Sequence, residues 1–164
     1  MTIRPAETSD FARIAAIYGH YVLNGLASFE EEAPDEGEMR ERWRKIDALH
    51  LPYLVATVDS EVAGYAYASQ YRPRLAYRYS IEDSIYIDVN HQRKGIGRAL
   101  LSLLIETTVL QGYRQMIAII GDSANVPSIA LHEGFGFRRV GVLESVGYKF
   151  ERWVDTVIMQ RPLG

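Results

Sequence analysis

The residues best suited to chemistry lie in a basic, glycine-containing turn at residues 92–98. An apolar, strand-like run at 84–89 precedes this turn, and a helical pattern with Leu100, Leu103 and Leu104 on one face follows it. The backbone N–H groups of such a turn and the dipole of the following helix both favour an anion. Gly95 and Gly97 let the main chain approach a ligand closely, because neither carries a Cβ. The pattern therefore predicts a site for a phosphate-bearing ligand.

The glycine spacing excludes two common phosphate-binding motifs. A dinucleotide site needs a third glycine where Leu100 stands, and no acidic ribose reader is evident about 20 residues further on. A P-loop needs a Gly-Lys-Ser/Thr run after four spacer residues, which this turn lacks. What remains is Gln92-x-x-Gly95-x-Gly97 after a strand. An ordinary connection between a strand and a helix is the alternative interpretation.

Length and composition narrow the class of protein. The chain has 164 residues, 48% apolar and 24% charged, which predicts a single globular domain over residues 1–164. It contains no cysteine, which excludes disulfides, thiolate catalysis and cysteine zinc sites, so we expect no metal and a cytoplasmic location. No apolar run is long enough for a membrane span, and the net charge of −3 argues against nucleic-acid binding.

Hydrophobic periodicity predicts a mixed α/β order. Strands are expected at 2–6, 53–58, 62–69, 84–89, 115–120, 138–143 and 148–159. Helices are expected at 14–22, in a polar segment through Trp43, at 96–110 and at 125–132. An aromatic and basic loop at 71–80 surrounds Pro73. This order indicates a largely antiparallel start and one βαβ passage at the glycine turn.

Two landmarks make the chain resemble a known superfamily. Gln92-x-x-Gly95-x-Gly97 matches the acetyl-CoA signature of the GCN5-related N-acetyltransferases, Gln/Arg-x-x-Gly-x-Gly/Ala. Asn125 opens a helix about 30 residues later, and Gly-Phe-Gly-Phe follows at 134–137. Within this superfamily, the chain is most similar to the phosphinothricin and methionine sulfoximine N-acetyltransferases. The similarity runs nearly end to end, including the segments 3–6, 63–66, 76–78, 84–87, 91–93 and 146–149.

The resemblance implies both a fold and an activity. The fold is the α/β GNAT (acyl-CoA N-acyltransferase) fold, a central twisted mixed β-sheet flanked by helices. A splay between the fourth and fifth strands, 84–89 and 115–120, would hold the CoA. The activity is acetyl transfer from acetyl-CoA to the α-amine of a small amino-acid-like acceptor, of the phosphinothricin, methionine sulfoximine or methionine sulfone type. Transfer is direct in a ternary complex, since no cysteine carries the acetyl group. The resemblance also implies a homodimer.

Two residues are the catalytic candidates that the resemblance implies. An amine is mostly protonated near neutral pH, so a base must remove a proton. Glu82 lies just before the strand expected beside the thioester and resembles the family's catalytic carboxylate, with Asp83 as the adjacent competitor. His132 stands where many members have a tyrosine that protonates the CoA thiolate. An imidazole or imidazolium can donate there, and a buried structural histidine is the alternative.

The resemblance also assigns the binding residues. The thioester would lie along a strand whose main chain polarises its carbonyl group, and the pyrophosphate would lie at the turn that follows. The residues of this strand and turn are Ile85, Tyr86, Ile87, Arg93, Lys94, Gly95, Ile96, Gly97 and Arg98. Asn125 and Ser128 would contact pantetheine, although Asn125 equally suits a helix N-cap. Guanidinium groups suit carboxylate and phosphinate oxygens. The acceptor candidates are Phe29, Arg72, Arg74, Tyr77, Arg78 and Glu82, with Lys149 and Trp153 in addition.

Two alternative functions stay open at this point. The acceptor could be another amine, such as a polyamine, an aminoglycoside or a protein N-terminus, but the arginine-rich loop favours an anionic acceptor. The chain could also be a non-catalytic acyl-CoA-binding module, against which the presence of Glu82 argues.

Overall fold

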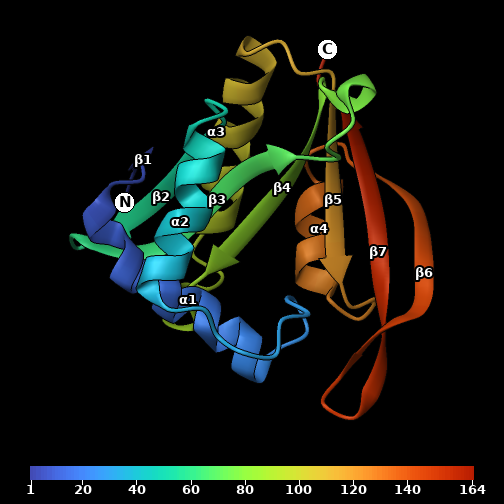
Figure 1. Cartoon of the computed structure of the whole chain (residues 1–164), viewed down its shortest axis with the longest axis horizontal. Helices are drawn as coiled ribbons and strands as arrows, with labels where there is room; N and C mark the ends of the chain where they lie inside the picture. Colours follow the sequence, from blue (N-terminus) through green and yellow to red (C-terminus); the bar gives the residue numbers. More distant parts are fainter.

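A computed structural model describes all 164 residues and shows one seven-stranded sheet with helices on both faces (Figure 1). The strand order is β1-β2-β3-β4-β5-β7-β6, and only β4 and β5 run parallel. The strands are β1 (Thr2–Pro5), β2 (Tyr53–Val58), β3 (Glu61–Gln70), β4 (Ser80–Ile87), β5 (Gln115–Gly121), β6 (Arg138–Lys149) and β7 (Arg152–Pro162). The single parallel pair is the predicted βαβ passage.

Four helices cover the two faces of the sheet. One face carries α1 (Phe11–Asn24) and α2 (Glu36–Asp47), and the other carries α3 (Ile96–Leu110) and α4 (Val126–Glu133). Each pair buries an apolar stripe, as the periodicity predicts. The first core contains Phe11 and Ile14 from α1, and the second contains Leu100 and Leu104 from α3. Asp35 caps α2 by accepting from the Glu38 backbone N–H.

The sheet splays open between β4 and β5. These strands pair from Ser80 with Gln115 to Asp83 with Ala118 and no further. Beyond that point β4 remains paired with β3 as far as Ile87, and β5 remains paired with β7 as far as Gly121. Asp83 therefore marks the apex of a wedge-shaped opening, and the predicted splay between the fourth and fifth strands is confirmed (Figure 1).

Alternate residues of β4 face opposite sides of the sheet. Ile85 packs against the core on the α3 side, whereas Tyr86 packs against the core on the α1 side. Glu82 shares the face of Tyr86, and Asp83 shares the face of Ile85. The two adjacent carboxylates thus flank the apex of the splay from opposite faces.

Two predicted strand boundaries are wrong. The strand expected at 84–89 begins at Ser80 and ends at Ile87, since Val89–His91 form a 3-10 turn capped by Asp88. Glu82 consequently lies inside β4 and not before it. The break expected between 143 and 148 is a bulge, where the Ser145 N–H donates to Asp155. The actual turn lies at Phe150 and Glu151, both in the left-handed region.

Candidate active site

The turn before α3 has the geometry of an anion cradle. Arg93 and Gly95 have φ values of 60° and 78°, in the left-handed region. Gly95 is the N-cap of α3, and the space where its Cβ would lie is open. The first N–H groups of α3 have no partner within the helix and point out of its N-terminus. The turn therefore presents backbone donors and a helix dipole to the same point.

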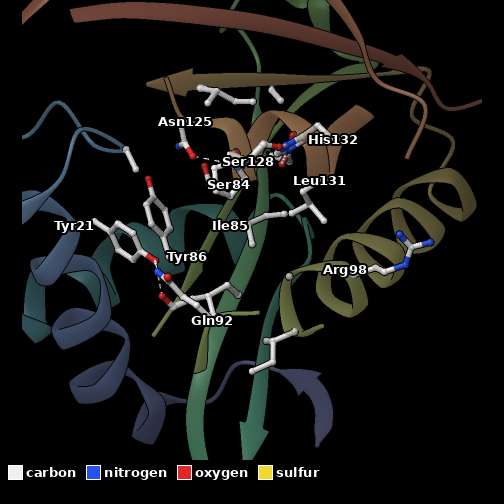
Figure 2. Close-up of a pocket in the computed structure, with 18 of the residues that line it drawn as sticks. Tyr21, Ser84, Ile85, Tyr86, Gln92, Arg98, Asn125, Ser128, Leu131 and His132 are labelled. Atoms are coloured by element: carbon white, nitrogen blue, oxygen red, sulfur yellow. Dashed lines mark hydrogen bonds and ion pairs between the residues drawn. The ribbon is translucent and has the colours of Figure 1, made fainter. Parts of the chain in front are cut away.

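This turn opens onto a pocket of about 470 Å³ between β4, β5, α3 and α4 (Figure 2). Every residue predicted to bind the cofactor lines it except Lys94, which is exposed. The far end of the pocket reaches Asp83, Ser84 and Ala118 at the apex of the splay. A pocket of this volume is typical of small-molecule sites. Its shape joins an anion cradle at one end to buried titratable groups at the other.

Two cradle-side contacts were not predicted from the sequence. The Tyr21 hydroxyl, from α1, donates to the Ile87 carbonyl oxygen at 2.5 Å and accepts from Gln92 Nε2 at 3.2 Å (Figure 2). The Arg98 guanidinium lies over the Phe135 ring, 5.2 Å from its centroid. The Ile87 carbonyl already has a donor, and the Arg98 charge is held beside the loop after α4. The spacing of the basic residues gave no sign of either arrangement.

Asn125 is the N-cap of α4. Its Oδ1 accepts from the Ser128 backbone N–H at 3.3 Å, and its Nδ2 donates to the Gly121 carbonyl oxygen at 3.3 Å (Figure 2). Both Asn125 and Ser128 line the pocket. The Asn125 amide therefore joins the end of β5 to the start of α4, which fixes one wall of the pocket.

His132 forms a buried pair with Asp83 at the apex of the splay. Its Nε2 lies 2.9 Å from Asp83 Oδ2, and the two side chains are 5% and 1% exposed. Its Nδ1 lies 2.7 Å from the Ser128 carbonyl oxygen. Burial lowers the pKa of His132, but the Asp83 carboxylate raises it, and the net pKa is above its ordinary value. Sequence reasoning named His132 but missed this partner, which lies 49 residues away.

Glu82 lies on the other face of β4 and does not line the large pocket. None of the side-chain hydrogen bonds in the structure involves its carboxylate. Burial raises the pKa of Glu82, the neighbouring charge of Asp83 adds to this rise, and the Arg72 guanidinium opposes it. A carboxylate whose pKa is raised towards neutrality is suited to accept a proton from an amine.

The arginine-rich loop is largely exposed. The Arg72 guanidinium lies 4.4 Å from the centroid of the Tyr71 ring, and that of Arg78 lies 4.8 Å from the Tyr79 ring. Tyr77 packs edge-on against Tyr71. Of the predicted acceptor residues in this loop, Arg72 is the one whose charge acts on Glu82. Arg74, Tyr77 and Arg78 are exposed and do not line the pocket.

Phe29 lies in the loop between α1 and α2, close to two glycines. A Cβ on Gly147 would lie 2.4 Å from the Phe29 ring, and one on Gly121 would lie 2.8 Å from it. The ring therefore lies between the end of β5 and strand β6, where only glycines leave it room. It is 40% exposed, and Ala27 from the same loop lines the pocket.

Lys149 is not free to bind an acceptor. Its side chain is buried, and its Nζ donates to the carbonyl oxygens of Gly25 and Ser28 at 2.8 and 2.6 Å. It thereby ties β6 to the loop that carries Phe29. Trp153, the other candidate from this hairpin, is exposed and packs against Tyr148.

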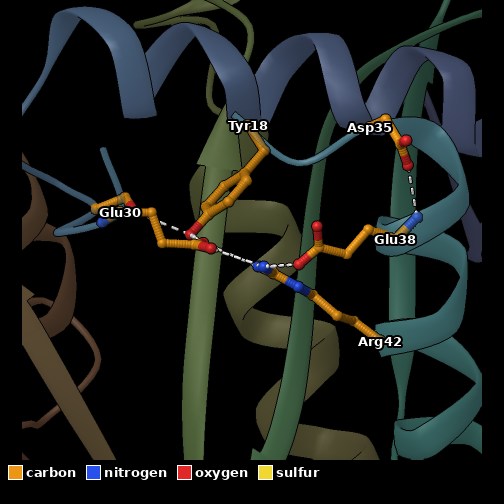
Figure 3. A network of polar contacts seen from close by, with 6 residues as sticks. Tyr18, Glu30, Asp35, Glu38 and Arg42 are labelled. Atoms are coloured by element: carbon orange, nitrogen blue, oxygen red, sulfur yellow. Dashed lines mark hydrogen bonds and ion pairs between the residues drawn. The ribbon is translucent and has the colours of Figure 1, made fainter. Parts of the chain in front are cut away.

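A polar network holds the same loop from the helical side (Figure 3). Arg42 of α2 donates two hydrogen bonds to Glu30, at 2.8 and 2.6 Å, and another to Glu38. Tyr18 of α1 donates to Glu30 and contacts the Ser28 hydroxyl. Burial, together with the Glu30 carboxylate, raises the pKa of Tyr18 to about 12. The loop at 25–30 is thus fixed by α1, α2 and β6.

The fold and the pocket define the class of protein, and comparison with known families agrees. Residues 3–158 match the Acetyltransferase (GNAT) domain family. The chain therefore belongs to the GNAT family of acetyltransferases, which confirms the resemblance seen in the sequence. No cluster of three metal-ligating side chains is present, and no helix is both long and apolar enough to cross a membrane.

Individual relatives make the match more specific. The chain is 52% identical over 162 residues to the phosphinothricin N-acetyltransferase of Alcaligenes faecalis, covering 99% of this chain and 82% of the relative. It is 38% identical to the L-methionine sulfoximine/L-methionine sulfone acetyltransferase of Salmonella typhimurium, with coverages of 99% and 95%. The crystal structure of a phosphinothricin acetyltransferase from Sinorhizobium meliloti with acetyl-CoA is 48% identical, with a TM-score of 0.96 and coverages of 99% and 88%.

Proposed function

We propose that this enzyme transfers the acetyl group of acetyl-CoA to the α-amine of a small amino-acid-like acceptor. The supporting observation is one pocket that is lined both by the cradle at Gly95 and by Asp83 at the apex of the splay. The cradle suits a pyrophosphate, the splayed edge of β4 suits a chain of amides, and titratable groups meet at the apex. The names of the relatives point to phosphinothricin, methionine sulfoximine and methionine sulfone as acceptors.

The two proposed proton transfers take place on opposite faces of β4. Glu82 takes a proton from the acceptor amine, and its raised pKa suits that task. His132 is proposed to protonate the departing CoA thiolate from the opposite face. The β4 main chain at Ile85–Ile87 lies along the thioester and polarises its carbonyl oxygen. Arg93, with the backbone of Gly95–Arg98, holds the pyrophosphate.

The acceptor site is proposed on the Glu82 side of the sheet. Phe29 forms one wall, and Arg72 lies beside Glu82, where a guanidinium suits an acceptor carboxylate. Arg74, Tyr77 and Arg78 are exposed, and their proposed role is in an outer rim of the acceptor site. A cationic polyamine would meet Arg72 unfavourably, which favours the amino-acid-like acceptor.

A panel of amines tests the proposal. The purified enzyme is mixed with acetyl-CoA and each amine, and thiol release is followed. Release with methionine sulfoximine, methionine sulfone or phosphinothricin supports the proposed acceptor class. Release with spermidine or an aminoglycoside alone contradicts the acceptor class but leaves the transferase, and no release with any amine contradicts the function.

Glu82→Gln tests the base. We expect kcat to fall by about 10²–10⁴-fold while acetyl-CoA still binds, since the amide keeps the shape but cannot accept the proton. The wild-type rate should rise with pH through the elevated pKa of Glu82, and this rise should be absent from the variant. Glu61→Gln, an exposed carboxylate on β3, is the matched control. Equal rates in Glu82→Gln and wild type would show that Glu82 is not the base.

The same substitution has a predicted effect on stability. Because the pKa of Glu82 is raised in the fold, its stabilising contribution is present below the unfolded pKa and is lost as pH rises through the folded pKa. Ionisation of Glu82 therefore costs the folded state more free energy than it costs the unfolded chain. We expect Glu82→Gln to be at least as stable as wild type in thermal unfolding at neutral pH, despite its loss of activity.

We further propose that residues 1–164 act as one catalytic domain in a cytoplasmic homodimer. Acetyl-CoA is an intracellular metabolite, and several exposed apolar side chains lie on β6 and β7, namely Val140, Val142, Val146, Tyr148 and Trp153. Exposed apolar side chains of this kind suit a protein interface. Analytical ultracentrifugation should give the mass of two chains for wild type and a smaller mass for Trp153→Glu. A monomeric wild type would contradict the dimer.

A further inference from the structure

The hydrogen-bond geometry of His132 fixes where its protons lie. The Ser128 carbonyl oxygen can only accept, so Nδ1, at 2.7 Å, must carry a proton. Nε2 faces Asp83 Oδ2 at 2.9 Å, which requires a second proton between these two atoms. Without it, an imidazole lone pair would face a carboxylate inside the protein. The pair therefore holds one transferable proton, on either Nε2 or Oδ2.

The surroundings keep this proton on the pair. Both side chains are almost fully buried, and Phe137 packs edge-on against the imidazole ring. Ser128 holds the ring from α4, and Glu82 is the titratable neighbour of Asp83, on the opposite face of β4. The other oxygen of Asp83, Oδ1, is buried without a hydrogen-bond partner in the protein. An ionised carboxylate with one oxygen buried and unpartnered is costly in the protein interior, which favours a proton shared between Asp83 and His132.

We propose that Asp83 is a positioning residue that keeps a transferable proton on His132, at the apex of the splay, for the departing thiolate of CoA. This inference rests on the proposed acetyl transfer. It assigns to Asp83 a task separate from that of Glu82, although the two carboxylates are adjacent in the sequence. Alternation along β4 places one on each side of the sheet.

The protons balance over one turnover. The acceptor nitrogen attacks the thioester carbonyl carbon, a C–N bond forms and the C–S bond breaks. The nitrogen gives up a proton to Glu82, and the sulfur takes the proton held between Asp83 and His132. The pair is then one proton short, with an ionised carboxylate and a neutral imidazole. Glu82 releases its proton to solvent and a proton from solvent restores the pair, so the enzyme returns to its starting state. No oxidant, reductant or further reactant is needed.

Asp83→Asn tests the assignment in kinetics. The amide keeps the shape and can donate to Nε2, so the ring stays in place while the transferable proton is lost. We expect kcat to fall by about 10²-fold, with an unchanged KM for acetyl-CoA. The alkaline fall in kcat should also move to lower pH, because His132 loses the carboxylate that raises its pKa. Asp59→Asn, in the exposed β2–β3 turn, is the matched control.

A spectroscopic measurement on the wild type keeps the test independent of the variant's folding and of catalysis. With ¹⁵N-labelled histidine, the shared proton should give a low-field resonance coupled to this pair, identified by its loss in His132→Gln. No such resonance at neutral pH would overturn the proposal. So would an Asp83→Asn enzyme with wild-type kcat, or one whose kcat falls with an unmoved pH profile. If no amine of the panel gives thiol release but the resonance is present, the proposed function is wrong, whereas the proton shared by Asp83 and His132 is confirmed.

Discussion

Gly147→Ala should disturb the acceptor side of the site through Phe29. A Cβ at residue 147 would lie 2.4, 2.8 and 2.9 Å from three carbons of the Phe29 ring. Contacts under 3.0 Å cannot persist, so the ring must move by about 1 Å. It cannot do so freely, because Gly121 bounds its other side and Lys149 ties its loop to β6.

The expected size of the effect follows from this confinement. Overpacking of a fixed side chain costs about 1–3 kcal/mol, and we expect that loss in the free energy of unfolding measured with urea. Gly147 does not have a positive φ, so no backbone strain adds to it. Displacement of Phe29 should raise KM for the acceptor more than KM for acetyl-CoA, since Phe29 is proposed to wall the acceptor site.

Gly141→Ala is the matched control on the same strand. A Cβ at residue 141 would have no atom within 4 Å, so its effect on stability should be within about 0.5 kcal/mol. If Gly147→Ala and Gly141→Ala unfold alike and have the same KM for the acceptor, the Phe29 ring is not confined and the reasoning is wrong. Phe29→Ala combined with Gly147→Ala should recover the part of the loss that comes from the clash.

Further predictions concern the loop and the cradle. Lys149→Met should lower the free energy of unfolding by about 1–3 kcal/mol for each of the two carbonyl groups left without a donor. Lys45→Met, which changes an exposed lysine, should leave it unchanged. Equal urea midpoints for the two variants would contradict the prediction. Gly95→Ala should destabilise α3 by about 1–2 kcal/mol and raise KM for acetyl-CoA. Gly112→Ala meets the same backbone strain at the far end of α3, so an equal rise in KM there would refute the cradle.

Much of the fold could be predicted because its signals are local. The helix at 96–110 was predicted with its observed bounds, since Gly95 precedes a clear apolar stripe. The start of β4 was missed because Glu82 and Asp83 together resemble an exposed loop. Both are largely buried at the centre of the sheet, one on each face, and only the pairing of β4 with β3 and β5 shows this.

The candidate site could also be predicted where its signals are local, and not where its residues meet across long stretches of sequence. The cradle and the Asn125 N-cap come from short motifs, and the structure brings these residues to one pocket. The partners of His132 and Lys149 lie 49 and more than 100 residues away, so no spacing rule reveals them. Lys149, an additional acceptor candidate in the sequence, instead joins strand β6 to the loop before α2 through buried hydrogen bonds.

The splay gives this sheet four edges where an ordinary open sheet has two. The outer edges belong to β1 and β6, and the inner edges are the parts of β4 and β5 beyond Asp83 and Ala118. An inner edge carries the same unpaired backbone groups as an outer one, but it lies inside the molecule, beyond the reach of another protein's strand. The unpaired backbone groups of β4 and β5 can therefore hydrogen-bond to a narrow, extended ligand, while a strand of another protein cannot reach them.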